Sequence, residues 1–172
     1  NTAVGDRAGT AVTTGTSNTL IGGLAGDALT DADLNTAVGY QALSSDTLGS
    51  RSTAMGQGSL FSQNFTTATD TYNTAYGFHS GLSITTGFQN VLLGGLAGDA
   101  LTDADYNVAI GTGALGSDTL GSRSVAIGNG SLTAQNFTTA TDSYNVAVGF
   151  NAGVSVTTGT NNTIVGGLAG DA

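Results

Sequence analysis

The sequence predicts an all-β fold, a parallel β-solenoid in which the chain coils into ten rungs stacked along one axis. Two observations predict it: a five-residue phrase of the type Asn-Val-Ala-Val-Gly recurs ten times, and its copies are regularly spaced. The copies begin at Asn1, Asn18, Asn35, Ser52, Asn73, Asn90, Asn107, Ser124, Asn145 and Asn162. Successive starts lie 17, 17, 17 and 21 residues apart, and this series then repeats. Such self-similarity at a fixed period is typical of stacked units that bury their apolar side only against neighbours.

The rungs group into a longer repeat of 72 residues. Residues 18–89 differ from residues 90–161 at only 22 of 72 positions. We therefore expect one repeat array, residues 1–172, made of two superrepeats, residues 1–72 and 73–144, and a partial third, residues 145–172. Because the chain starts at a rung boundary and stops inside a rung, we expect it to be a segment of a longer fibre.

The phrase itself predicts a short strand, and we number rung positions from its Asn or Ser. Position 2 is always Thr or Val, and position 4 is almost always a large apolar residue. Residues two apart in a strand share a face, so we expect positions 2 and 4 to point inside the coil. Position 3, which is mostly Ala, then faces outward. A small apolar column on an outer face favours packing against another copy of the chain.

Two further positions of the phrase indicate backbone constraints. Position 5 is Gly in all ten rungs, which indicates a sharp bend or a close approach of two backbones. Position 1 is Asn or Ser, which is consistent either with a plain turn residue or with a ladder of stacked amides.

The second halves of the rungs predict turns, loops and a second strand. We expect that strand near positions 8–13 of each rung. The 21-residue rungs contain Gln63 to Asp70, repeated at 135–142, and their four additional residues predict a protruding loop.

The phrase Ser124-Val125-Ala126-Ile127-Gly128-Asn129-Gly130-Ser131 is similar to the head repeat of trimeric autotransporter adhesins, the YadA-like head. Residues 35–43, Asn-Thr-Ala-Val-Gly-Tyr-Gln-Ala-Leu, resemble a related repeat of long surface and tail-fibre-like proteins. The resemblance implies a left-handed parallel β-roll, three chains side by side, and a location outside the cell. It also implies binding to matrix proteins or to other cells. Rungs of 17 and 21 residues are longer than is common in that family.

Composition excludes several classes of function. The formal charge is −9, with three Arg, no Lys and twelve acidic residues, so the chain lacks the cations that neutralise nucleic acid or an anionic membrane. No cysteine is present, which excludes disulfides, thiol catalysis and thiolate metal sites. We expect no cofactor and no metal.

Two acidic turns nevertheless resemble the start of a calcium loop. They are formed by Asp27, Asp31 and Asp33 and by Asp99, Asp103 and Asp105. Both lack the Gly and the terminal Glu of such a loop. A solvated acidic edge is therefore the preferred interpretation.

The remaining candidates give no sign of catalysis. His79 is the only histidine, and its counterpart in the next superrepeat is Asn151, so a recurring Ser-His-Asp set is excluded. Arg51 and Arg123 are expected to pair with Asp46 and Asp118 or to cap a rung edge. We expect no enzyme.

Two alternatives concern exposed surfaces. The loops at Phe65 and Phe137, followed by Tyr72 and Tyr144, are either partner sites or local apolar plugs beneath a loop. Thr-rich faces also raise ice binding, but the Thr of the phrase alternates with Val and is expected to point inward.

The sequence as a whole favours a structural and adhesive segment of a homotrimeric extracellular fibre, on a cell surface or a virion. The alternative is a filament or phage tail-fibre shaft without an adhesive role, possibly a single-chain solenoid.

Overall fold

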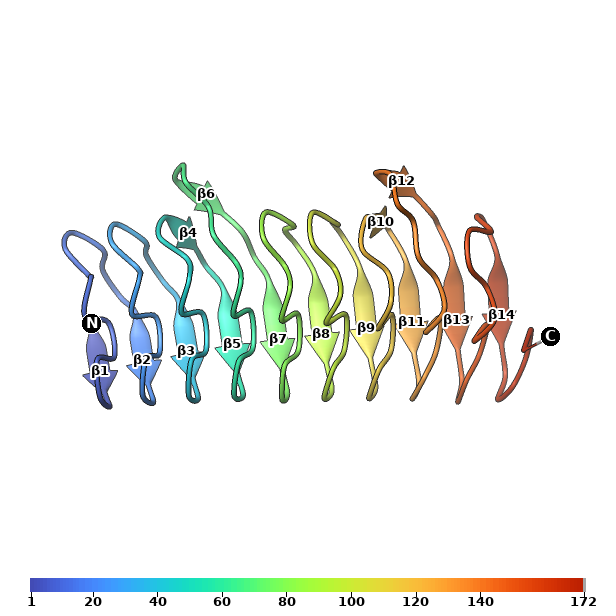
Figure 1. Cartoon of the computed structure of the whole chain (residues 1–172), viewed down its shortest axis with the longest axis horizontal. Coiled ribbons are helices and arrows are strands. Elements are labelled where there is room, and N and C mark those ends of the chain that lie inside the picture. Colours follow the sequence, from blue (N-terminus) through green and yellow to red (C-terminus); the bar gives the residue numbers. More distant parts are fainter. Residues whose placement is uncertain (172) are drawn as a thin grey trace.

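The computed structural model describes residues 1–171, which form a parallel β-solenoid of ten rungs (Figure 1). Each rung contributes one main strand, and that strand always occupies positions 2–4 of the phrase. The main strands are β1 Thr2–Val4, β2 Thr19–Ile21, β3 Thr36–Val38, β5 Thr53–Met55, β7 Thr74–Tyr76, β8 Val91–Leu93, β9 Val108–Ile110, β11 Val125–Ile127, β13 Val146–Val148 and β14 Thr163–Val165. No helix that could cross a bilayer occurs in these residues.

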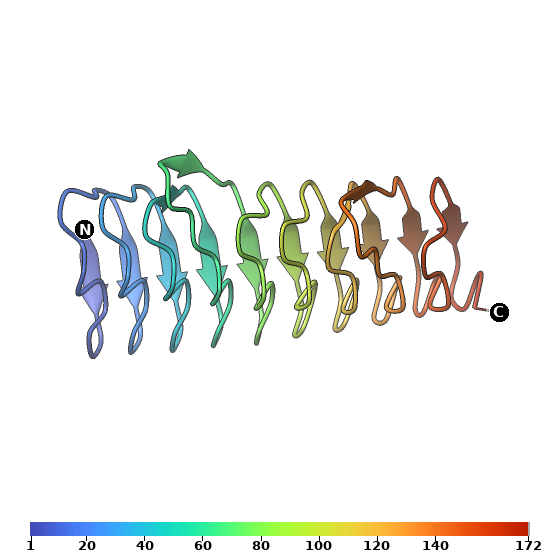
Figure 2. The same cartoon turned by 45° about the horizontal axis from the view of Figure 1, so that its top comes forward.

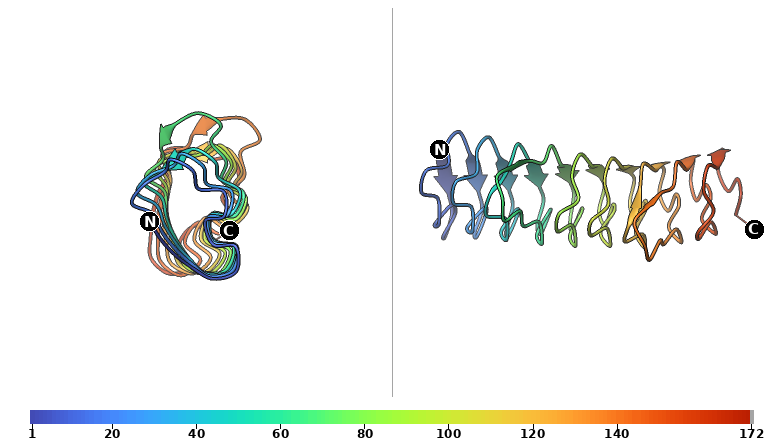
Figure 3. Two further views of the ribbon diagram at one scale, coloured as in Figure 1. Left: turned by 90° about the vertical axis from the view of Figure 1, so that its left-hand side faces the viewer. Right: turned by 90° about the horizontal axis from the view of Figure 1, so that it is seen from above.

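The main strands form one ten-stranded sheet in chain order, and every neighbouring pair is parallel. Pairing is in register, so like positions stack: Ala37 pairs with Ala54, and Ala54 pairs with Ala75. Viewed along the axis, the rungs superimpose as closed loops (Figure 3, left). The predicted fold class is therefore confirmed.

Four two-residue strands mark the 21-residue rungs: β4 Gly49–Ser50, β6 Thr69–Asp70, β10 Gly121–Ser122 and β12 Thr141–Asp142. β4 pairs with β6, and β10 pairs with β12. The longer rungs bulge outward at β6 and β12, on one side of the rod (Figures 1 and 2). The predicted protruding loops are confirmed.

The predicted second strand at positions 8–13 is wrong. These positions lie in turns, and the positive φ angles of positions 7 and 9 break any extended run, as at Gln41 (59°) and Leu43 (53°). The strands of the second half are limited to the flanks of the long rungs.

The predicted orientation of the phrase is also wrong, and the true orientation is its inverse. Position 3 is fully buried in eight rungs, whereas position 4 is exposed or half-buried throughout. Asn at position 1 lies on the same face as position 3 and is buried with it. The interior is narrow, so it takes Ala or one Leu per rung, and the β-branched residues at positions 2 and 4 lie outside.

Core side chains compensate for one another in size. Leu20 and Leu92 occupy position 3 where position 9 is Gly, and a Cβ on Gly26 would lie 2.7 Å from Leu20 Cδ2. Where position 3 is Ala54, position 9 is the buried Leu60. This alternation of large and small residues fills the interior at the density expected of a protein core.

The Gly at position 5 is required by a close backbone approach. At Gly94, φ is +136°, and a Cβ would lie 2.7 Å from the carbonyl carbon and oxygen of Gly111 in the next rung. Both predicted causes, a bend and a close approach, therefore apply.

The Asn at position 1 forms a ladder along the rod. Each side-chain oxygen accepts the backbone N–H of position 1 in the next rung, as from Asn35 to Asn18 Oδ1 (2.9 Å). The side-chain amide donates to a carbonyl 14 residues ahead, as from Asn18 Nδ2 to Ala32 O (2.7 Å). The ladder interpretation is confirmed, with backbone groups as the main partners.

A polar pair interrupts one core column in each superrepeat. Position 12 is apolar in most rungs, as at Leu29 and Ile84, but it is Asp46 and Gln63 in the third and fourth rungs, both fully buried. Gln63 Nε2 donates to Asp46 Oδ2 (2.6 Å), while Asp46 Oδ1 accepts the N–H groups of Gly49 (3.0 Å) and Phe65 (3.0 Å). Asp118 and Gln135 repeat the pair. Every one of these contacts adjoins a 21-residue rung.

Adjacent residues test the orientation. Leu92 is fully buried and Leu93 is 38% exposed. We expect Leu92→Ala to lower the free energy of unfolding by about 2–5 kcal/mol and Leu93→Ala by about 1 kcal/mol or less. Urea unfolding, followed by circular dichroism in dilute solutions shown to be monomeric, measures both. The opposite order would contradict the orientation described above.

Candidate functional site: the outer sheet face

The outer face of the ten-stranded sheet is the largest unpartnered apolar feature of the described residues. Along each main strand exposure alternates, with positions 1 and 3 buried and positions 2 and 4 outside. Position 2 forms a Thr/Val column and position 4 an aliphatic column. The aliphatic column comprises Val4, Ile21, Val38, Met55, Tyr76, Leu93, Ile110, Ile127, Val148 and Val165.

Two further columns flank this face. The residue two before each strand forms the pre-strand column, and the residue two after each strand forms the post-strand column. The pre-strand column comprises Ser17, Leu34, Arg51, Tyr72, Gln89, Tyr106, Arg123, Tyr144 and Asn161. The post-strand column comprises Asp6, Gly23, Tyr40, Gln57, Phe78, Gly95, Thr112, Asn129, Phe150 and Gly167. Each pre-strand residue has a φ between 50° and 65°, which turns the chain into the strand.

The pre-strand arginines pair with the projecting loops. Arg51 Nε lies 2.9 Å from Asp70 Oδ1 in β6, and its guanidinium lies 5.8 Å from the Tyr72 ring centroid. The predicted pairing of Arg51 with Asp46 is wrong, because Asp46 is buried and saturated by the polar pair described above.

The second superrepeat repeats this arrangement. Arg123 Nε lies 3.0 Å from Asp142 Oδ2, so its predicted pairing with Asp118 is wrong for the same reason. The Arg123 guanidinium lies 4.6 Å from the Tyr106 ring centroid and 6.0 Å from that of Tyr144. The hydrogen bond with Asp142 raises the pKa of Arg123 above its usual value. These partly exposed pairs are each worth about 1 kcal/mol or less.

The first three residues of the acidic turns are held by the chain's own donors. Thr14 Oγ1 donates to Asp31 Oδ1 (2.5 Å), and the Thr16 N–H donates to Asp33 Oδ1 (2.6 Å). This backbone hydrogen bond lowers the pKa of Asp33. Asp27, in the same rung, has one buried carboxylate oxygen without a partner in residues 1–171.

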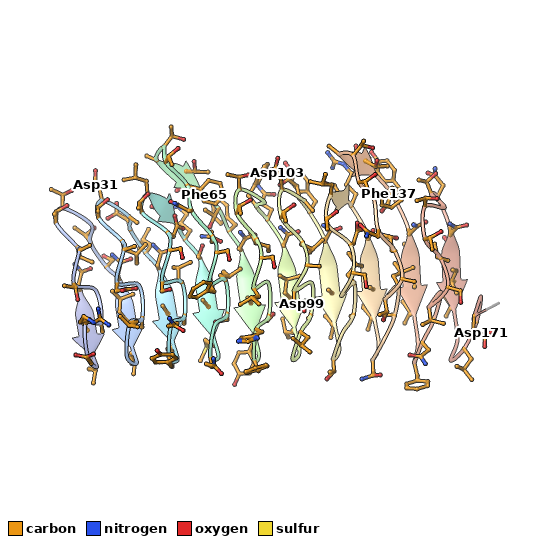
Figure 4. All side chains as sticks on the ribbon, viewed as in Figure 1. Asp31, Phe65, Asp99, Asp103, Phe137 and Asp171 are labelled. Atoms are coloured by element: carbon orange, nitrogen blue, oxygen red, sulfur yellow. The ribbon has the colours of Figure 1, made fainter. Side chains whose placement is uncertain are left out.

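The second acidic turn differs in its electrostatics. Desolvation raises the pKa values of Asp99 and Asp105, although Asp105 also accepts the Phe88 N–H (3.0 Å). Asp103 accepts Thr86 Oγ1 (2.6 Å), and Figure 4 shows Asp99 well away from Asp103. Within residues 1–171, no three acidic or imidazole side chains gather in a metal-binding cluster. The geometry supports an acidic edge rather than a calcium loop.

The aromatic residues of the long rungs divide into two kinds. Phe65 and Phe137 are 7% and 6% exposed, so they form plugs beneath the loops (Figure 4). Tyr72 and Tyr144 are exposed in the pre-strand column. The plug interpretation is thus confirmed for the phenylalanines.

The structure removes one argument against ice binding and supplies another. Thr at position 2 points outward, so the predicted inward orientation is wrong. However, the Thr/Val column is Val in four consecutive rungs, and the adjoining face carries Tyr76 and Phe78 at more than half exposure. A flat Thr array is not formed.

His79 lies beside this face without a catalytic setting. Its ring stacks on Phe78 with centroids 3.8 Å apart, and its Nε2 lies 3.5 Å from Gln57 Nε2. No cavity is found in the part of the chain that the structure describes.

Sequence reasoning missed both the outer apolar face and the buried Asp46–Gln63 pair. Aligning the rungs by position would have shown the pair, because it falls in an otherwise apolar column. Comparison with protein-family models, curated proteins and solved structures gave no match.

Proposed function

We propose that this chain is a structural and adhesive segment of an extracellular homotrimeric fibre, with the outer sheet face as the interface between chains. The observation that carries the proposal is the continuous apolar surface along the full length of the rod. Nine spacings of about 4.8 Å give a length of about 43 Å, and the span from pre-strand to post-strand column is about 20 Å. The resulting area of roughly 800 Å² equals one partner's share of a standard interface.

An apolar patch of this size exceeds what monomeric proteins usually leave exposed. The proposed interface lies on positions 2 and 4 and not on the Ala column at position 3, which is buried. The formal charge of −9 lies outside the aliphatic column, so association does not require burial of carboxylates there. The number of chains, the extracellular location and the adhesive role are supported by the resemblance of the phrase to YadA-like heads.

Light scattering tests the assembly. We expect a particle of about 50 kDa, three times the chain mass of 16.8 kDa. Ile110→Asp combined with Ile127→Asp places two carboxylates in the centre of the aliphatic column and should give a monomer with an unchanged β spectrum, because buried unpaired charges are costly. Thr85→Asp, in an exposed turn, is the control and should stay oligomeric. A monomeric parent chain would contradict the proposed fibre.

Adhesion is tested separately, on surfaces coated with extracellular-matrix protein. The oligomer is expected to bind, and shortening the loop at 66–69 is expected to weaken binding if that loop carries the contact. An oligomer that binds no coated surface would support the alternative function, a shaft without an adhesive role.

A further inference from the structure

The pre-strand and post-strand columns match each other strand by strand, although they cannot touch within one chain. The two residues that flank a strand are six positions apart, which corresponds to about 20 Å of extended chain. Their correspondence therefore calls for an explanation outside the single chain.

Large exposed apolar residues flank the same strand in three pairs: Leu34 with Tyr40 at β3, Tyr72 with Phe78 at β7, and Tyr144 with Phe150 at β13. All six are between 48% and 55% exposed. Every aromatic residue of the post-strand column thus lies level with a large apolar residue of the pre-strand column.

Polar residues follow the same rule. Both arginines are level with carboxamides: Arg51 with Gln57 at β5, and Arg123 with Asn129 at β11. The ion pair of Arg51 uses Nε, and a guanidinium carries further N–H donors on its Nη atoms, which an amide oxygen can accept.

Small residues complete the pattern. The three post-strand glycines that follow β2, β8 and β14 are level with polar residues: Gly23 with Ser17, Gly95 with Gln89, and Gly167 with Asn161. One strand departs from the rule, since Tyr106 is level with Thr112. Its ring is instead engaged by its own chain, at 5.3 Å from Phe88 and 4.6 Å from the Arg123 guanidinium.

We infer that the pre-strand column of one copy contacts the post-strand column of a second copy, with both copies parallel and in register. This inference rests on the proposed function and specifies the geometry of its interface. In any cyclic assembly whose axis runs along the rod, with the sheets facing that axis, the N-terminal edge of each sheet meets the C-terminal edge of its neighbour at the same level. Antiparallel face-to-face packing instead places like columns together.

In this arrangement the aromatic pairs bury each other's rings and the arginines meet amide oxygens. A shift by one rung would place Arg51 against Tyr40 or Phe78, and Tyr72 against Gln57. The matched columns therefore set both the direction and the register of neighbouring chains.

Cysteine cross-linking tests the pairing, and the chain contains no native cysteine. Arg51→Cys and Gln57→Cys combined in one chain cannot bridge internally, because a disulfide requires Cα atoms less than about 7 Å apart. Under mild oxidation of the intact oligomer we expect most of this variant to run as a covalent oligomer on non-reducing gels. Arg123→Cys with Asn129→Cys should do the same.

Two controls define the register and the direction. Arg51→Cys with Gly95→Cys places the thiols two strands out of level, and it should remain uncross-linked. Gly95 suits this control because its φ is not positive and a Cβ there meets only Phe78 O, at 3.9 Å. Each single variant should also remain uncross-linked.

The outcomes separate this inference from the proposed function. An oligomer whose single Arg51→Cys variant cross-links to itself would show antiparallel packing, and cross-linking only in the out-of-level variant would show a shifted register. An oligomer without cross-links in either level pair would show a different interface. Each of these overturns the inference and leaves the fibre standing, whereas a monomer in light scattering overturns both.

Discussion

Gly94→Ala is expected to lower the free energy of unfolding by about 3 kcal/mol or more, and to leave part of the chain unfolded at 37 °C. The substitution places a Cβ 2.7 Å from the backbone of Gly111 and forces a φ of +136° on a residue with a side chain. Backbone atoms of the next rung cannot move away without breaking the ladder, so both the strain and the lost pairing remain. Urea unfolding followed by circular dichroism measures the loss.

The adjacent glycine provides the control. Gly95→Ala changes the same atoms at a position without positive φ and with open space, so its effect should lie within about 0.5 kcal/mol of zero. Equal losses for the two variants would mean that the rungs do not approach each other at position 5 as described.

Asp46→Leu is expected to cost about 3 kcal/mol or more, although leucine is the residue of that core column in neighbouring rungs. The change leaves three buried donors without their acceptor: the N–H groups of Gly49 and Phe65 and the side-chain amide of Gln63. Each unsatisfied buried donor costs about 1–3 kcal/mol. Asp70→Asn, which weakens only the partly exposed pair with Arg51, should cost less than about 1 kcal/mol.

The second superrepeat is an internal control for this variant. In a repeat protein stability is close to a sum of local terms, so the loss should be confined to nearby rungs. Native-state hydrogen exchange is expected to rise in residues 46–73 and to stay unchanged in residues 118–145. Uniform loss of protection along the rod would contradict a local role of the Asp46–Gln63 pair.

The repeat period made most of the architecture predictable from the sequence. Ten copies of the phrase, with Gly at position 5 in each, predicted parallel in-register strands and a backbone constraint that Gly94 shows directly. The four additional residues of the long rungs likewise predicted the projecting loops.

The orientation of the strands was not predictable in the same way, because alternation with a period of two fits either face. Treating the β-branched residues as the core gave the wrong phase. The buried amide of Asn18 was the signal that resolves it, since positions 1 and 3 share a face. Asp46 was misassigned because in the linear sequence it lies among turn residues, and only its level within the rung places it in the core.

The two projecting loops have a consequence for how a longer fibre of this kind would engage a surface. They recur every four rungs, about 19 Å apart, on the same side of the rod (Figures 1 and 3). A fibre with more superrepeats would present more copies at that fixed interval, so its length would set its valency. Weak individual contacts would then add as avidity, without any change in the affinity of a single loop.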